Sequence, residues 1–272
     1  MNSRLSILIL LIGLSVTSCR QEVTKLDPLQ QNILESTVYA DTRQIQSDKE
    51  SLVLSENKVM SMSFVKEYFD SNKIDSLTYL RFNKNGQLIQ RTTDELTSVG
   101  CLPHTYVQIF RYENNKIKRV ESYTFKYKTK SVFEKWLETD TSRLKIFEWE
   151  DYTYSGDTIF IESGSGKWEY IKNKNGNLEG IFHKVKSTNE FREEKYSLTP
   201  FGVKKQFIYD GSTQIDYDYI VDENKVEIKS LNSKGYNRSE NIYNSKGLLM
   251  EIIYYENNQK VARTKIDYTY YM

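Results

Sequence analysis

The sequence contains few of the residues from which compact catalytic and metal sites are built. Its 272 residues include 2 cysteines, at Cys19 and Cys101, and 2 histidines, at His104 and His183. A structural zinc site takes four Cys or His ligands, and the segment from Cys101 to His104 offers two. The same pair would need a third, orienting group to act as a nucleophile and base. We therefore predict no metal, no cofactor and no catalytic residue, and we assign no site to Cys101.

An excess of charge of one sign is missing as well. The chain has 38 basic and 37 acidic residues, for a net charge of +1. Binding to nucleic acid rests on a basic excess, and binding to anionic lipid headgroups rests on a polybasic segment. We expect no nucleic-acid partner. Phosphate-binding loops, the serine-hydrolase elbow, zinc-protease signatures and acidic calcium loops are not found either, which removes the enzyme classes that carry them.

Long apolar runs are missing after the first stretch of the chain. In that stretch Arg4 is followed by the apolar run Leu5 to Val16 and then by small residues up to Cys19. Twelve residues at ~1.5 Å each cannot cross ~30 Å of hydrocarbon, so the run predicts a secretory signal rather than a spanning helix. Val16-Thr17-Ser18-Cys19 resembles the lipobox of bacterial lipoproteins.

That resemblance implies three further expectations. Residues 1–18 would be a signal peptide that is removed, and Cys19 would become an acylated first residue whose partner is membrane lipid. Arg20 follows Cys19 where an Asp would imply retention in the inner membrane. We therefore expect a lipid-anchored protein of the outer membrane in a cell envelope, on a face that the sequence leaves undecided.

Removal of residues 1–18 from the 272 would leave 254 residues, with 37 basic and 37 acidic side chains once Arg4 is gone. We predict a lipidated tether over residues 19–50 and one domain over residues 51–272. Asp27-Pro28-Leu29-Gln30 has the features of a helix start, because Asp27 can cap, Pro28 fits the first turn and Gln30 can complete a capping box. This predicts a short helix from Pro28 to about Ser36, followed by a polar loop.

The rest of the chain is rich in residues that favour β-strands. There are 21 Tyr and 12 Phe but only 3 Pro, and stretches such as Tyr106–Tyr112 and Thr264–Tyr270 alternate as half-buried strands do. Between them a turn signature recurs, in which an aromatic or aliphatic residue precedes Asn, Asp or Gly, which tolerate positive φ. Clear examples are Asn83–Leu88, Tyr112–Ile117, Asn173–Leu178, Tyr209–Gly211, Val221–Val226, Leu231–Gly235, Tyr243–Leu248 and Tyr255–Val261.

Turns ten or twelve residues apart predict one strand and one loop per unit. The fold class is therefore mainly all-β, an antiparallel up-and-down meander of hairpins with more than ten strands from about Ser51 to Met272. Whether this sheet stays open or curls into a barrel is undecided. Gly86, Gly176, Gly235 and Gly247 are expected at positive φ at the hairpin tips.

One stretch departs from the strand pattern. Ser131-x-x-Glu134 is a capping box, and Val132 to Leu137 predicts a two-turn helix against the sheet. The hairpins resemble the tyrosine–aspartate repeats of RHS-type bacterial proteins, although only Tyr209-Asp210 keeps the literal pair. This resemblance implies a chain of sequential hairpins and no catalytic residue.

These observations favour a non-enzymatic binding or scaffold protein. A sheet with this many aromatic residues is expected to expose some of them, and Trp136, Trp149 and Trp168 could form a platform for a glycan or protein partner. Two alternatives stay open. One is an envelope glycan hydrolase or glycan-binding module, because carboxylates are abundant. The other is an immunity-type lipoprotein that binds one protein partner.

Overall fold

The computed structural model describes residues 26–42, 46–71, 74–95, 104–126, 146–172, 178–185, 190–230 and 237–272. Two helices precede the strands in this part of the chain, and no helix in it is long and apolar enough to cross a membrane. The elements are α2 (Pro28–Thr42), α3 (Asp48–Glu56), β1 (Val59–Tyr68), β2 (Ile74–Phe82), β3 (Leu88–Glu95), β4 (His104–Glu113), β5 (Lys116–Lys126), β6 (Glu148–Ser155), β7 (Thr158–Ser163), β8 (Gly166–Lys172), β9 (Leu178–Val185), β10 (Phe191–Thr199), β11 (Gly202–Tyr209), β12 (Ser212–Asp222), β13 (Lys225–Ser230), β14 (Arg238–Tyr243), β15 (Leu249–Glu256) and β16 (Gln259–Tyr270).

The strands form one closed antiparallel barrel. Each strand pairs with the next along the chain, and the last strand, β16, pairs with β1 to close the ring. In that closing pair Phe64 lies opposite Ile266 and Tyr68 lies opposite Ala262. The predicted antiparallel meander of more than ten strands is confirmed, and the question of an open or closed sheet is answered by closure.

The tight turns have the chemistry that the sequence predicted. The Asn83 side chain accepts hydrogen bonds from the backbone N–H groups of Asn85 and Gln87, both at 3.0 Å. Asn244 does the same toward Lys246 and Leu248, at 2.9 Å and 3.1 Å. Gly86 and Gly247 lie at φ values of 72° and 76°, as expected. Gly176 and Gly235 lie outside the described residues.

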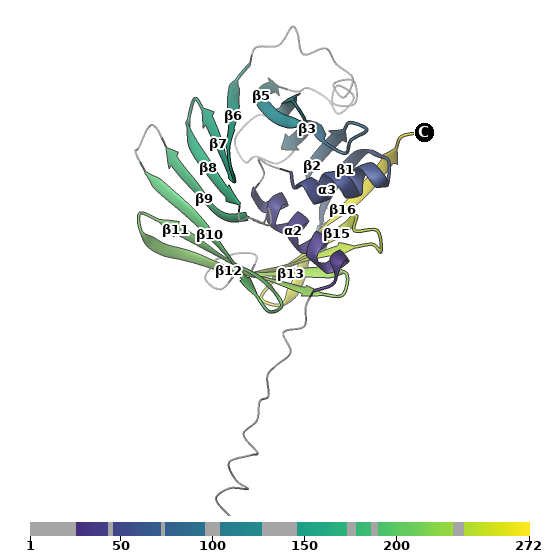
Figure 1. Ribbon diagram of the computed structural model, residues 1–272. Coiled ribbons are helices and arrows are strands. Elements are labelled where there is room, and N and C mark those ends of the chain that lie inside the picture. Colours follow the sequence, from purple (N-terminus) through teal and green to yellow (C-terminus); the bar gives the residue numbers. More distant parts are fainter. Residues whose placement is uncertain are drawn as a thin grey trace, which may run out of the picture.

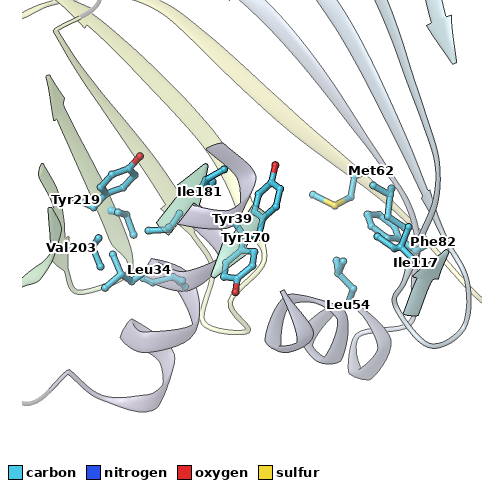
Figure 2. Packing of buried hydrophobic residues seen from close by; sticks show 14 of the residues in the cluster. Leu34, Tyr39, Leu54, Met62, Phe82, Ile117, Tyr170, Ile181, Val203 and Tyr219 are labelled. Carbon is cyan, nitrogen blue, oxygen red and sulfur yellow. The ribbon is translucent and has the colours of Figure 1, made fainter. Parts of the chain in front are cut away.

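The two helices lie inside the ring of strands, near one end of it (Figure 1). Their apolar side chains Ile33, Leu34, Val38, Tyr39 and Leu54 are at most 5% exposed. Figure 2 shows Leu34 on the side of Val203 and Tyr219, and Leu54 on the side of Met62, Phe82 and Ile117. The core of the protein is therefore the space between these helices and the inner wall of the barrel.

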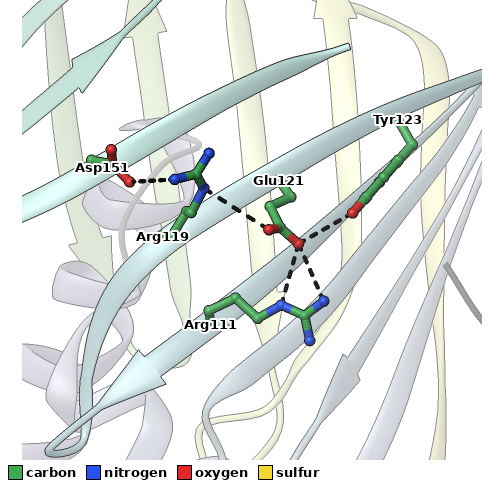
Figure 3. Close-up of polar contacts among 5 residues, drawn as sticks. All are labelled: Arg111, Arg119, Glu121, Tyr123 and Asp151. Atoms are coloured by element: carbon green, nitrogen blue, oxygen red, sulfur yellow. Dashed lines mark hydrogen bonds and ion pairs between the residues drawn. The ribbon is translucent and has the colours of Figure 1, made fainter. Parts of the chain in front are cut away.

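Side chains alternate between the two faces of each strand, so the core fixes which positions face inward. Phe110 and Val120 face the core, and the neighbouring Arg111, Arg119 and Glu121 consequently face outward. These three charged residues form a network with Asp151 and Tyr123 (Figure 3), in which Arg111 lies 3.2 Å from Glu121 and Arg119 lies 3.4 Å from Asp151. The outer wall therefore carries paired charges at this point.

Two predictions about the helices were wrong. Helix α2 does not end near Ser36 but continues to Thr42, because Val38 and Tyr39 belong to the core. The chain from Ser51 does not start a strand but lies in α3, which Ser47 caps by accepting a hydrogen bond from the Glu50 N–H at 3.0 Å. The helix predicted from Val132 to Leu137 lies outside the described residues.

Candidate binding surface on the inner wall

The two ends of the barrel differ. We call one the plugged end, because α2 and α3 are attached to its turns. Gln46 of the helical segment donates from Nε2 to the Gly86 carbonyl and accepts from the Leu88 N–H, both at 2.9 Å, and Ser55 donates to the Lys84 carbonyl at 2.9 Å. Thr37 of α2 shares a hydrogen bond with the Tyr243 hydroxyl at 2.7 Å. The opposite end, which includes the β7–β8, β11–β12 and β15–β16 turns, we call the mouth.

The inner wall changes from apolar to polar along the barrel. On several strands, the inward-facing residue two positions nearer the mouth than a core residue is polar, charged or a partly exposed aromatic. We call these residues the polar ring: Lys66, Arg91, Gln108, Ser122, Glu150, Trp168, His183, Glu194, Lys205, Tyr217 and Thr264. Side chains of this kind are costly to bury without partners. The ring therefore marks the level at which the apolar core ends.

The aromatic part of the polar ring is the pair Trp168 and His183. They occupy opposite positions on β8 and β9 and stack with ring centroids 4.3 Å apart at an interplanar angle of 8°. Burial lowers the pKa of His183, and the positive charge of Arg192 lowers it further. The stacked pair is thus a flat, neutral surface on the inner wall, of the kind on which sugar rings and planar groups pack.

A buried cation forms the next part of the ring. The Lys205 ammonium is 3.1 Å from Glu194 Oε2, and the Tyr196 hydroxyl donates to the same oxygen at 2.5 Å. It also lies over the rings of Tyr196 and Tyr217, at 5.8 Å and 5.3 Å from their centroids. Lys205 is only 7% exposed. This group is a complete ion pair, so its role is to hold β10, β11 and β12 in place.

Two glutamates interact with Arg91 of the polar ring: Glu50 of α3 and Glu150, which is itself a ring residue. Arg91 donates to Gln108 at 3.4 Å, and its charge acts on both Glu50 of α3 and Glu150 of β6. Burial raises the pKa of Glu50 to about 7, with Arg91 opposing and Glu35 reinforcing the shift. Burial also raises the pKa of Glu150, although the hydroxyl of Tyr152, which donates to it at 3.0 Å, opposes this. The interior thus holds two carboxyl groups that take up protons more readily than usual.

A hollow of about 160 Å³ lies on the outer wall, lined by Ile220, Asp222, Lys225, Glu227, Arg238 and Glu240. Arg238 pairs with both Glu227 and Glu240, and the Tyr255 hydroxyl donates to Glu240 at 2.7 Å. The Arg238 guanidinium also stacks over the Tyr255 ring at 4.4 Å. These side chains bond one another and so hold β13, β14 and β15 together. The hollow is therefore a structural contact rather than a binding site.

The residues singled out from the sequence are not brought together. Trp149 faces outward, and the Arg119 guanidinium lies 5.1 Å from the centroid of the tryptophan ring. Trp168 faces inward, so the two tryptophans lie on opposite faces of the wall. His104 begins β4, and the described residues contain no group of three His, Cys, Asp or Glu side chains fit to hold a metal ion. Cys19, Cys101 and Trp136 lie outside the described residues. The Trp168–His183 stack was missed because pairing across strands β8 and β9 depends on register.

No protein-family model matches the chain, and no curated protein matches it. A porin-like protein from Bacteroides uniformis is similar in structure over 78% of this chain and 97% of its own, with 8% identity and a TM-score of 0.48. The TcdB2-TccC3-Cdc42 structure is similar over 73% of this chain and 13% of its own, with 11% identity and a TM-score of 0.27. Over the residues that the structure describes, the chain forms an antiparallel sixteen-stranded β-barrel with an internal helical plug.

Proposed function

We propose that this protein is a non-enzymatic binding protein of the cell envelope, anchored to the outer membrane through acylated Cys19, that binds a polar ligand on the inner wall of its barrel. The observation that carries the proposal is the polar ring. The helices complete the core at the plugged end, and the wall nearer the mouth carries charges, amides and a stacked Trp168–His183 pair that the core does not use. Such a mixture of aromatic faces and hydrogen-bonding groups suits a glycan.

The entry point of the chain supports an anchor at the plugged end. Helix α2 starts at Pro28, and the side chain of Leu29 lies beside Gly247 in the β14–β15 turn of that end. Asp27 lies eight positions after Cys19 in the sequence, a reach of roughly 28 Å when fully extended. An acylated Cys19 would hold the plugged end near the bilayer and leave the mouth facing away from it.

The anchor is tested by labelling. Cells that produce the full chain are grown with labelled palmitate, and the same is done with the Cys19→Ala variant. We expect label in the native protein, no label in the variant, and loss of the variant from the membrane fraction. Label that persists in Cys19→Ala would refute the anchor.

Ligand binding is tested through a matched pair of tryptophan variants. Trp168→Leu removes the inner aromatic surface, and Trp149→Leu removes a tryptophan from the outer wall of the same barrel. Chito-oligosaccharides and malto-oligosaccharides are titrated into each protein by calorimetry. We expect binding by the native protein and by Trp149→Leu, and at least a tenfold loss, about 1.4 kcal/mol, in Trp168→Leu. If the native protein binds no oligosaccharide, the ligand is not a glycan of these kinds. If both variants bind equally well, the binding site is not on the inner wall.

Glycan hydrolysis is a second candidate, favoured by Glu50 and Glu150. Glycosidases use two carboxyl groups, one of which has a raised pKa and acts as the acid. In this barrel both carboxyls have a raised pKa, and tyrosines such as Tyr152 lie beside them. The same oligosaccharides, incubated with native protein and with Glu150→Gln, distinguish the two candidates. Release of reducing ends by the native protein alone would show hydrolysis, whereas intact sugar with both proteins would support binding.

A further inference from the structure

The plugged end exposes large apolar side chains around its rim. On the outer side of α3, Leu52 is 57% exposed, and at the β10–β11 turn Leu198 and Phe201 are 70% and 56% exposed. The end of β16 adds Tyr270 at 52%. Strands β10 and β11 and the end of β16 reach the same end of the meander as the β14–β15 turn. These four residues, which we call the apolar rim, surround the end at which the chain enters the barrel.

We propose that the apolar rim lies against the surface of the membrane. This proposal rests on the anchor at Cys19 and specifies the surface that the anchor brings to the bilayer. Large apolar and aromatic side chains at the edge of a protein are the groups that enter the boundary between headgroups and acyl chains. Because the tether is short, the effective concentration of this end at the bilayer is high, and a contact too weak to bind alone becomes populated.

Charge supports a neutral lipid surface rather than an anionic one. Lys58 and Lys84 lie at the plugged end, and so do Asp48 and Glu56 on the outer side of α3. The two signs occur together, so the rim has no net attraction for a charged headgroup. Phosphatidylcholine vesicles are therefore the appropriate probe.

The mouth supplies the matched control. Phe191, at the start of β10, is 43% exposed at the other end of the same strand that carries Leu198. A label at position 191 and a label at position 201 therefore report on opposite ends of the same barrel.

The experiment uses the full acylated chain with Cys101→Ser, so that a single new thiol can carry an environment-sensitive fluorophore. The added substitution is Phe201→Cys in one protein and Phe191→Cys in the other. Each is reconstituted into phosphatidylcholine vesicles with and without doxyl-labelled lipid. We expect quenching at least about twofold stronger at position 201 than at position 191. Leu198→Cys replaces Phe201→Cys if circular dichroism shows that the latter is unfolded.

The other outcomes separate the rim from the anchor. Protein that stays with the vesicles while neither label is quenched refutes the apolar rim and leaves the anchor intact. Equal or stronger quenching at position 191 shows that another face meets the bilayer, which also refutes the rim. Protein that carries no acyl group and does not float with the vesicles refutes the anchor, and the rim proposal falls with it.

Discussion

Gly86 of the β2–β3 turn is in direct contact with the backbone of Ser51 in α3. A Cβ placed on Gly86 would overlap the Ser51 carbonyl oxygen and would come within 2.8 Å of the Ser55 nitrogen. Because these are backbone atoms of a helix, they cannot rotate out of the way. We therefore expect Gly86→Ala to displace α3 from the turn and to lower the free energy of unfolding by more than about 2 kcal/mol. Urea titration followed by circular dichroism measures this.

The matched control for Gly86 is Gly156. It also has positive φ, 56°, but a Cβ there would meet nothing within 4 Å. Gly156→Ala should therefore lower the free energy of unfolding by only about 1 kcal/mol, from backbone strain alone. Equal losses in the two variants would show that the contact with α3 adds nothing.

Gly247 combines positive φ with a looser contact. A Cβ there would lie 3.5 Å from Leu29 Cδ1 and 3.8 Å from Val53 Cγ1, which is ordinary van der Waals distance. We expect Gly247→Val to lower the free energy of unfolding by about 1 kcal/mol or more, because a β-branched residue is strained at a φ of 76°. Glycan binding should be retained. Loss of binding with an unchanged melting temperature would instead make the turns ligand contacts.

In an open sheet the C-terminal hairpin would be the first part to suffer from Gly247→Val, because β16 would end the sheet and have a neighbour on one side only. In the structure β16 pairs with β15 and also with β1, so this hairpin has no free edge. We therefore expect the variant to unfold as one cooperative unit, with the same midpoint by tryptophan fluorescence and by circular dichroism.

Adjacent lysines on β11 should respond very differently to truncation. Lys205 faces inward and pairs with Glu194, whereas Lys204 faces outward, where its side chain is 37% exposed beside Asp216. Lys205→Ala leaves a largely buried carboxylate unpaired, and we expect a loss of about 2–3 kcal/mol. Lys204→Ala removes an exposed pair and should cost less than about 1 kcal/mol. Chemical denaturation of both variants measures the two losses in unfolding free energy. Similar losses would mean that the Lys205 side chain is exposed to solvent.

Local chemistry accounts for the parts of the fold that the sequence predicted. Alternation identified strands such as β4 and β16, Asn83 and Asn244 fixed their turns, and Asp27 with Gln30 does form the capping box, at 2.8 Å and 3.1 Å. Helix α3 was missed although Ser47-x-x-Glu50 is itself a capping-box pattern. The interpretation of that segment as a loop gave too much weight to its lack of apolar period.

Closure and the inner wall could not be predicted in the same way. Closure depends on pairing between β1 and β16, which lie at opposite ends of the domain, and no local pattern encodes that pairing. Trp168 and Trp149 look equivalent in the sequence, yet strand parity sends one inward and the other outward. Both faces of these strands carry aromatic residues, so composition alone does not tell which face points inward. The position of the helices inside the barrel decides it.

The last prediction concerns the pH dependence of stability through Glu50. Its charge interacts with those of Arg91 on β3 and Glu35 on α2 and acts on Tyr243 of β14 and Tyr268 of β16, and burial raises its pKa from 4.5 to about 7. A raised carboxyl pKa means that the folded state binds the proton more tightly than the unfolded state does. Its contribution to stability is therefore complete below pH 4.5 and is lost as the pH rises through about 7.

Glu50→Gln removes this titration and keeps the shape of the side chain. We expect the variant to gain about 1–2 kcal/mol relative to the native protein between about pH 5 and pH 8, the partial exposure of Glu50 keeping the gain below the full shift. Glu67 on the outer wall is the control of opposite sign. A hydrogen bond from Lys265, assisted by Arg263, lowers its pKa, so Glu67→Gln should cost stability at neutral pH and progressively less as the medium becomes acidic. Urea titrations of the three proteins from about pH 3 to about pH 8 measure both trends, because the contribution of Glu67 is lost only as the pH falls below 4.5. A gap between native protein and Glu50→Gln that stays constant with pH would mean that Glu50 is ionised in the folded barrel at every pH examined.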